Sequence, residues 1–491
     1  MSQHELDNPP RRALLKSSAM AVAFAGSPAV NALQSMATQQ RANAPASALM
    51  DSPYGPVAPV RDSVTGLELL QLPQGFNYAT LSWSGDTMSN GQSVPLSHDG
   101  MGVIAEQGDE IILVRNHERG AGPLINALGL YDEAAMASGQ HAAGGTTNIH
   151  FSRSERRELR TSPSLGGTLA NCAGGVTPWG TWLSCEETTN DNSASGGRKH
   201  GYVFEVTADP AQTTGEPIVD MGRFKHEAVA VDPANSYVYL TEDNRNHSPI
   251  YRFIPNDDSQ QTGALEKGGR LQAAKVVGIE RAGLLVPELG QEVEVEWVDI
   301  IDPDMGPIGD LSGPYLQANE AGALSISRGE GIWYSEGLFY IVDTSAGENA
   351  DGEPGQGEGA VWMLDPAENR LRCLFASTSA QMANNPDNIA VSPRGGVVLC
   401  EDGGGVDDQF GFGERVMGLQ VTGDTFIFAK NNIVLSEGNI SSSGKQCAPG
   451  DYRQQEVAGA CFDSTGEFLF INIQTPGITF AIWGPWERGP L

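Results

Sequence analysis

The sequence has few basic residues: 30 Lys and Arg stand against 61 Asp and Glu, which gives a formal net charge of −31. Binding of nucleic acid needs clustered positive charge, so this balance argues against nucleic acid as a partner. It is compatible with cation binding, and equally with an acidic surface that keeps a protein soluble. No stretch beyond the N-terminal region approaches ~18 uninterrupted apolar residues, so no membrane span is predicted.

Cysteine is also scarce, with six residues in 491 and no CxxC pair among them. The chain is therefore not a small disulfide-rich protein, although one or two disulfides are compatible with export. The motifs GxSxG, the P-loop and HExxH are missing as well. Their absence removes the usual sequence signs of a serine hydrolase, a nucleotide-binding loop or a zinc protease.

The N-terminus carries a twin arginine, Arg11 and Arg12, before a weakly apolar, Ala-rich run over residues 17–32. This arrangement predicts a Tat export signal, and the alternative is a basic tail before an ordinary helix. We expect residues 1–46 to form the signal peptide and a disordered leader, and residues 47–491 to form a single catalytic domain. The Tat export machinery is then a partner, and the location is periplasmic or extracellular.

Glycine and proline are abundant, at 60 and 29 residues, which favours many turns and short strands. Several segments share one pattern. A polar or acidic residue opens a short apolar strand, a turn follows, and a second apolar strand ends in an acid or an amide. A third strand with an aromatic residue comes after a loop. The pattern occurs at residues 97–118, 171–187, 226–244, 328–344, 385–405 and 456–477.

Repeated units of short strands predict an all-β fold, a β-propeller with six blades. Five or seven blades, two β-sandwiches, or an up-and-down barrel are the alternatives. Residues 119–161 and 256–323 interrupt the repeat and are expected to be loop or helical insertions. Such insertions usually lie on one face, often the functional one.

In a propeller the innermost strands run along the central axis, so the residues that open them can meet at one end. These positions are rich in metal-ligand types. Crowded carboxylates repel one another unless cations neutralise them, and the thiol of Cys185 adds a ligand for a transition metal. Solvated surface charge and purely structural calcium are the alternatives. The candidate ligands are Asn116, Glu118, Cys185, Glu186, Glu187, Glu227, Asp243, Glu330, Asp343, Asp387, Asn388, Glu401 and Asp402.

Arg328 precedes Glu330 by two residues, so on an extended chain both side chains point to the same side. A guanidinium among carboxylates and metals can bind an anionic substrate, above all a phosphate. Metal ions together with an arginine are the usual components of phosphoryl transfer. The alternative is an arginine that only pairs with Glu330 or another acid.

Six short segments occur in a fixed order after the twin arginine: NHE, TPWGTWLSCEE, GRFKHEA, SRGEG, NPDN and NIQTPG. Together they resemble the PhoX-type alkaline phosphatases, and the resemblance covers roughly Val60 to Trp486. Each segment alone is a weak signal, and the combination is specific. The family often has His in the last segment, where this chain has Thr475.

The resemblance implies a six-bladed propeller that holds a pair of ferric ions and two or three calcium ions on its axis. It also implies hydrolysis of small phosphate esters at alkaline pH outside the cytoplasm, by a monomer. On the family pattern Cys185, Glu227 and Glu330 look like iron ligands, and Arg328 looks like the catalytic, phosphate-binding residue. The expected calcium or substrate contacts are Asn116, Glu118, Glu186, Asp387 and Glu401.

The sequence therefore predicts a secreted, metal-dependent phosphomonoesterase. Two alternatives belong to other classes. One is a calcium-dependent propeller hydrolase of lactones or phosphodiesters, in which Cys185 would be idle. The other is a non-catalytic binding propeller that calcium stabilises. Bound iron separates the first prediction from the calcium-dependent hydrolase. The binding propeller predicts instead that replacing Cys185 or Arg328 with alanine changes only stability.

Overall fold

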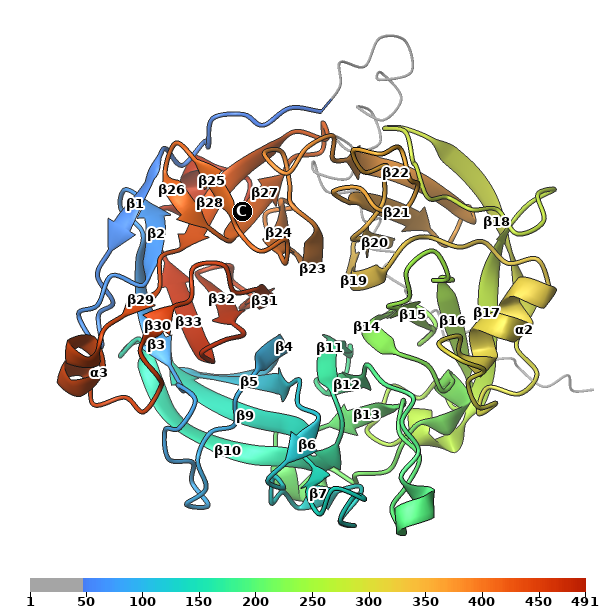
Figure 1. Ribbon diagram of the computed structural model, residues 1–491, viewed down its shortest axis with the longest axis horizontal. Coiled ribbons are helices and arrows are strands. Elements are labelled where there is room, and N and C mark those ends of the chain that lie inside the picture. Colours follow the sequence, from blue (N-terminus) through green and yellow to red (C-terminus); the bar gives the residue numbers. More distant parts are fainter. Residues whose placement is uncertain (1–46) are drawn as a thin grey trace, which may run out of the picture.

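The computed structural model describes residues 47–491, and strands make up most of its regular structure. The predicted Tat signal lies in residues 1–46, outside the described residues. Figure 1 shows the strands arranged radially around a central axis. None of the helices in the described part of the chain has the length and apolar character needed to cross a membrane.

Six strands lie nearest the axis, and each contacts the next, so that the last also contacts the first (Figure 1). This closed ring of inner strands is the defining feature of a β-propeller, and the predicted fold class is confirmed. The inner strands are β4 (His98–Gln107), β11 (Asn171–Val176), β14 (His226–Val231), β19 (Gly329–Ser335), β23 (Pro386–Val391) and β31 (Val457–Phe462).

The sheets run outward from these strands. The first has the order β4-β5-β9-β10-β7, with β5 (Glu110–His117), β9 (Gly144–Ser152), β10 (Arg157–Thr168) and β7 (Gly129–Leu130). The second is β11-β12-β13, with β12 (Trp182–Glu186) and β13 (Val203–Val206). A third, of nine strands, contains both β14 and β19; its order is β14, β15 (Val238–Glu242), β16 (Tyr251–Pro255), β17 (Gly269–Val276), β18 (Glu292–Asp299), β22 (Arg370–Ala376), β21 (Ala360–Asp365), β20 (Leu338–Asp343), β19.

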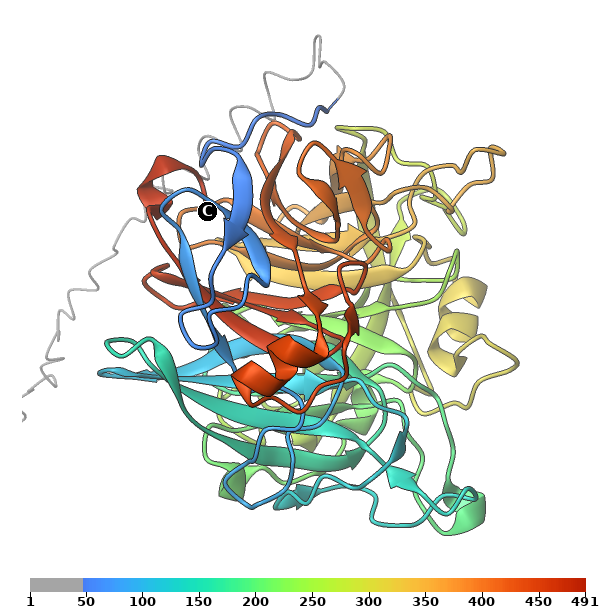
Figure 2. The same ribbon diagram turned by 60° about the vertical axis from the view of Figure 1, so that its left-hand side comes forward.

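The last two large sheets combine both ends of the described chain. One has the order β1 (Val57–Val60), β2 (Leu70–Pro73), β28 (Thr425–Asn431), β27 (Arg415–Leu419), β24 (Val397–Glu401), β23. The other has the order β3 (Asn77–Leu81), β33 (Ile478–Trp483), β32 (Phe468–Ile473), β31. N-terminal strands thus pair with C-terminal ones and close the ring without a covalent link, and Figure 2 shows them side by side.

Short elements decorate the loops. The helices are α2 (Gly313–Glu320) and α3 (Glu437–Ser443), and the two-stranded ribbons pair β6 (Ala121–Gly122) with β8 (His141–Ala142), β25 (Val406–Asp408) with β26 (Gly411–Gly413), and β29 (Val434–Leu435) with β30 (Gly450–Asp451). Single 3-10 turns are η2 (Ser193–Ser195), η3 (Pro210–Gln212), η4 (Val219–Met221), η5 (Leu265–Lys267) and η6 (Trp486–Arg488).

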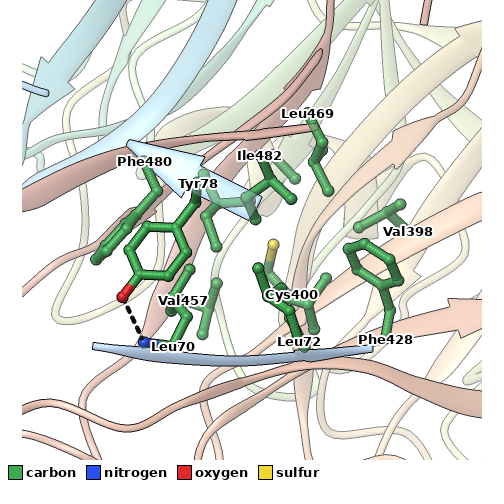
Figure 3. Packing of buried hydrophobic residues seen from close by; sticks show 14 of the residues in the cluster. Leu70, Leu72, Tyr78, Val398, Cys400, Phe428, Val457, Leu469, Phe480 and Ile482 are labelled. Atoms are coloured by element: carbon green, nitrogen blue, oxygen red, sulfur yellow. Dashed lines mark hydrogen bonds between the residues drawn. The ribbon is translucent and has the colours of Figure 1, made fainter. Parts of the chain in front are cut away.

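The core fills the spaces between neighbouring sheets. In Figure 3, Tyr78 and Ile482 from the last sheet face Leu72 and Phe428 from the sheet before it. The Tyr78 hydroxyl accepts a hydrogen bond from the amide of Leu70 at 3.3 Å, which pairs a buried polar group. Apolar side chains on both faces of each sheet are what packing between two neighbouring sheets requires.

The structure bears on the predicted number of blades and on the predicted insertions. Strand β18 joins two sets of strands into one nine-stranded sheet, so the sheets do not separate into six, and six blades stays a prediction. The interpretation of residues 119–161 as an insertion is wrong for β9 and the start of β10. The interpretation of residues 256–323 as an insertion is likewise wrong for β17 and β18, which belong to the nine-stranded sheet. Strand β9 (GGTTNIHFS) is buried along its whole length although it is largely polar, so hydrophobic alternation does not reveal it. All six cysteines are free.

Candidate functional site

Five inner strands begin in the same way. Their first residue pairs with the last residue of the neighbouring strand, and a β-bulge follows at once. In β31 the bulge falls one residue later, after Ala458. A bulge adds one residue and re-aims the side chains beside it. The second residues of the five strands, which the bulge re-aims, are Asp99, Cys172, Glu227, Glu330 and Asp387.

The neighbouring strands supply a second set of residues at the same end of the axis. The residue that follows each of these strands donates a hydrogen bond from its backbone amide to the backbone carbonyl of the residue that precedes the inner strand. For Glu118 and Glu187 the acceptors are Ser97 and Ala170, at 3.1 and 2.8 Å. The equivalent hydrogen bonds, 3.0–3.1 Å long, hold the backbone of Asp243, Thr344, Asp402 and Gln474.

These two sets converge on the axis. Ligand atoms of Cys172, Glu187 and Glu227 lie within 4.8 Å of one another, and so do those of Glu227, Glu330 and Asp387. The Gln474 amide donates to Asp99, Glu118 and Glu456, and so links three more acids to the group. We call the following residues the axial cluster: Asp99, Glu118, Cys172, Glu187, Glu227, Asp243, Arg328, Glu330, Asp387, Asp402, Glu456 and Gln474.

Burial and mutual repulsion disfavour the ionised carboxylates. Desolvation, and then the charge of Asp402, raise the pKa values of Glu118 and of Asp387 to about 7. Desolvation followed by the charge of Glu330 raises the pKa of Glu227 well above its usual range. The thiol of Cys172 also has a raised pKa, first because it is buried and then because acids surround it. Cations in the cluster would remove these penalties.

The donor set fits metal ions. Glu227 Oε2 is buried and has no hydrogen-bond partner among residues 47–491, while its Oε1 lies 3.2 Å from the sulfur of Cys172. A buried carboxylate oxygen without a partner is costly unless an ion binds it. An all-oxygen group suits a hard cation such as Ca²⁺, and the group with the thiol suits a transition metal.

Arg328 supplies the positive charge of the cluster. Its Nε and Nη2 donate to Asp243 at 3.0 and 3.1 Å, and Nη2 lies 2.6 Å from Oε1 of Glu330. Its Nη1 donates no hydrogen bond within the described chain, and 24% of its side chain is exposed. A guanidinium clamped on one edge and open on another can bind an anion that enters along the axis.

The family model for the alkaline phosphatase PhoX matches residues 52–477. The chain belongs to the PhoX family of alkaline phosphatases. Membership identifies it as a phosphoryl hydrolase and confirms the resemblance seen in the short segments.

Solved structures share the fold. Pseudomonas fluorescens PhoX in complex with vanadate, a transition state analogue, is 19% identical and superposes with a TM-score of 0.60, over 89% of this chain and 99% of that one. The gluconolactonase XC5397 from Xanthomonas campestris is 12% identical, with a TM-score of 0.37 over 91% of this chain and 99% of that one. A comparison with curated proteins found no match.

The structure of this PhoX family member brings eight of the predicted residues into the axial cluster: Glu118, Glu187, Glu227, Asp243, Arg328, Glu330, Asp387 and Asp402. The other candidates lie outside this cluster: Asn116, Cys185, Glu186, Asp343, Asn388 and Glu401. Cys185 is fully buried in an apolar cluster with Leu183, Val203 and Phe224, and the structure does not bring it to the axis. The cysteine on the axis is Cys172.

Glu186 and Glu401 are buried and satisfy groups within the sheets. Glu186 accepts from the amides of Leu169 and Gly201 and contacts His200, and Glu401 accepts from the amide of Asn384 and from Arg415. These two residues are the last of β12 and β24 and point away from the axis. The residues that follow them, Glu187 and Asp402, are the ones that join the axial cluster.

Asn116 holds the sheet of β11 in place. Its side-chain amide donates to the carbonyls of Cys172 and Ala173, and its oxygen accepts from Trp182 and Ser184. All its hydrogen bonds in the structure are internal, and two of them fix the backbone that carries Cys172.

Sequence reasoning did not select Asp99, Cys172 and Glu456, which the structure brings into the axial cluster. A signal for two of them was present in the repeat. Asp99 and Cys172 occupy the same position in their strands as Glu227, Glu330 and Asp387. An alignment of the strand openings with one another would have selected both.

Proposed function

We propose that this PhoX family member hydrolyses phosphomonoesters in the axial cluster, with metal ions held by the cluster and with Arg328 binding the phosphoryl group. The observation that carries the proposal is the convergence of nine buried or partly buried carboxylates and one thiol around a single arginine. No other group of described residues combines these features.

The metals we propose are iron and calcium. Cys172, Glu187 and Glu227 would hold iron, since a thiolate among carboxylates suits a transition metal. The remaining acids, with oxygen ligands alone, would hold calcium. Bound ions supply positive charge and activate water for attack on phosphorus.

The residues of the chain bind and orient the ester. Asp243 holds the Arg328 guanidinium through Nε and Nη2, which leaves Nη1 free to donate to substrate. Phosphoryl transfer spreads negative charge over the equatorial oxygens, and a guanidinium placed beforehand stabilises this charge without reorganisation. No described residue has to act as a covalent nucleophile.

The test is hydrolysis of para-nitrophenyl phosphate by purified protein with measured iron and calcium. A para-nitrophenyl phosphodiester and a lactone serve as comparison substrates at the same pH values. We expect the monoester to react fastest. Metal-loaded protein that hydrolyses no monoester from neutral to strongly alkaline pH would disprove the proposal, and faster reaction of the lactone or diester would favour the calcium hydrolase.

The two cysteines provide a matched pair of variants. Cys172→Ser should lose most of the bound iron, together with the visible absorption of an iron thiolate, because serine is a poor ligand for iron. Cys185→Ser should keep both signals and lose stability by about 1–3 kcal/mol, because a hydroxyl is buried among apolar side chains. Elemental analysis, absorption spectra and thermal unfolding measure these effects. Iron retained in Cys172→Ser and lost in Cys185→Ser would contradict the placement.

A further inference from the structure

A cavity of about 580 Å³ lies at the same end of the propeller as the axial cluster. Two residues that line it are chain neighbours of members of the axial cluster: Arg119 follows Glu118, and Thr475 follows Gln474. A third lining residue, Leu96, precedes Ser97, whose carbonyl accepts a hydrogen bond from the amide of Glu118. Consecutive Cα atoms are about 3.8 Å apart, so the wall of the cavity directly adjoins the cluster.

The rest of the lining is largely apolar and comes from loops distant in sequence. One loop connects β3 to β4, a second follows β5, and a third connects α3 to β30. The volume suits a small organic molecule, which such sites commonly hold against an apolar wall with few polar groups. The apolar lining includes Met88, Pro95, Leu124, Ile125, Tyr452 and Pro476.

Arg119 is the charged side chain of this cavity. It is partly buried, and its guanidinium makes no ion pair or side-chain hydrogen bond within residues 47–491. This is unusual in a chain where acids outnumber basic residues by 61 to 30. A Cβ atom at Gly122 would lie 2.9 Å from its Nη2, so glycine at this position leaves room for the guanidinium.

We propose that the cavity binds the alcohol part of the phosphate ester, and that Arg119 binds an anionic substituent on that alcohol. The preferred substrates are then phosphomonoesters of aromatic or other apolar alcohols that carry a second negative charge. The inference rests on the proposed function, since the axial cluster holds the phosphoryl group. An unpaired guanidinium matches an anion, and the apolar walls match the body of the alcohol.

Two esters of nearly equal size test the charge. In 4-carboxyphenyl phosphate the substituent is an anion, and in 4-carbamoylphenyl phosphate it is neutral. We expect the wild-type protein to prefer the carboxylated ester. Arg119→Met should lower the ratio of the two kcat/KM values by about 10-fold or more, as expected for a lost charge-assisted hydrogen bond.

Arg61→Met is the matched control, because Arg61 is exposed and pairs with Glu68 on the surface. It removes the same charge from the chain and should leave the ratio within about twofold of wild type, since surface charges are screened. An unchanged ratio in Arg119→Met, or an equal fall in Arg61→Met, would overturn the inference.

Direct binding separates this inference from the proposed function. 4-Hydroxybenzoate has the aromatic ring and the anion but no phosphate. Calorimetry should show that wild-type protein binds it and that Arg119→Met binds it at least about 10-fold more weakly. If neither ester is hydrolysed, the proposed function fails, and this comparison alone decides on the cavity. Equal binding by the two proteins, or none by either, would overturn the inference.

Discussion

Replacing Arg328 with alanine should lower kcat/KM for phosphomonoesters by about 10²- to 10³-fold, the usual effect of removing one donor that stabilises transition-state charge. The fall should be mainly in kcat, because charge on the equatorial oxygens grows in the transition state. The kcat/KM of Arg328→Lys should lie between those of the wild type and Arg328→Ala, since lysine keeps the charge and loses the planar fork. Both replacements keep the left-handed backbone at φ 60°, so backbone strain is the same in the two variants.

Metal content must be measured in the same samples. Arg328 lies beside Glu330 and Asp243, so its removal leaves these acids more open to cations, and we expect iron and calcium to be retained. Arg245→Ala is the control, because Arg245 donates to the carbonyl of Gly355 and not to an acid of the cluster. It should change kcat/KM by less than about threefold. Activity of fully loaded Arg328→Ala within that same range would reduce Arg328 to a structural partner of Asp243.

The fold could be predicted from the sequence because six segments share one strand pattern, although their residues are not closely identical. The six segments that share one pattern each supply an inner strand. The convergence of their acids followed from the propeller alone, and the structure brings Glu227, Glu330 and Asp387 together. The order of the segments identified the family that the match to PhoX then confirmed.

The errors at the site come from one structural feature. Adjacent acids end several of the second strands, as in Glu186–Glu187 and Glu401–Asp402, and only one of each pair faces the axis. Side chains alternate along a strand, so a choice that is wrong by one residue selects the opposite face. The alternation of apolar and polar residues does not reveal β-bulges, and here bulges set which side chains face the axis at the start of the inner strands.

The acid of each pair that points away from the axis has its own function. Glu186 accepts from the amide of Leu169, and Glu401 accepts from the amide of Asn384. Each of these amides lies two residues before an inner strand, and Asp343 accepts from Ser327 in the same way. The first acid of the pair thus holds the turn that places the second at the axis. A buried amide without a partner would be costly, which explains an acid at a position that binds no ligand.

Removal of the metal ions should lower the free energy of unfolding, by an amount that grows as the pH rises. Without cations, burial and neighbouring acids raise the pKa of Glu118 and of Asp387 to about 7, against about 4 in an unfolded chain. Below about pH 4 both states are protonated and the penalty is absent. As the pH rises from 4 to 8 the unfolded chain loses protons that the folded cluster keeps, so the free energy of unfolding falls.

Thermal unfolding of chelated and metal-loaded protein between pH 5 and 8 measures this effect. We expect Tm of the chelated protein to fall by roughly 5–10 °C over this range, and Tm of the loaded protein to fall much less, because bound cations favour the ionised acids. Asp402→Asn removes one repelling charge and should raise Tm of the chelated protein while it lowers Tm of the loaded one. A chelated protein whose Tm is constant or rises with pH would show that its acids are neutralised by other means than metal, and the opposite signs in Asp402→Asn would then disappear.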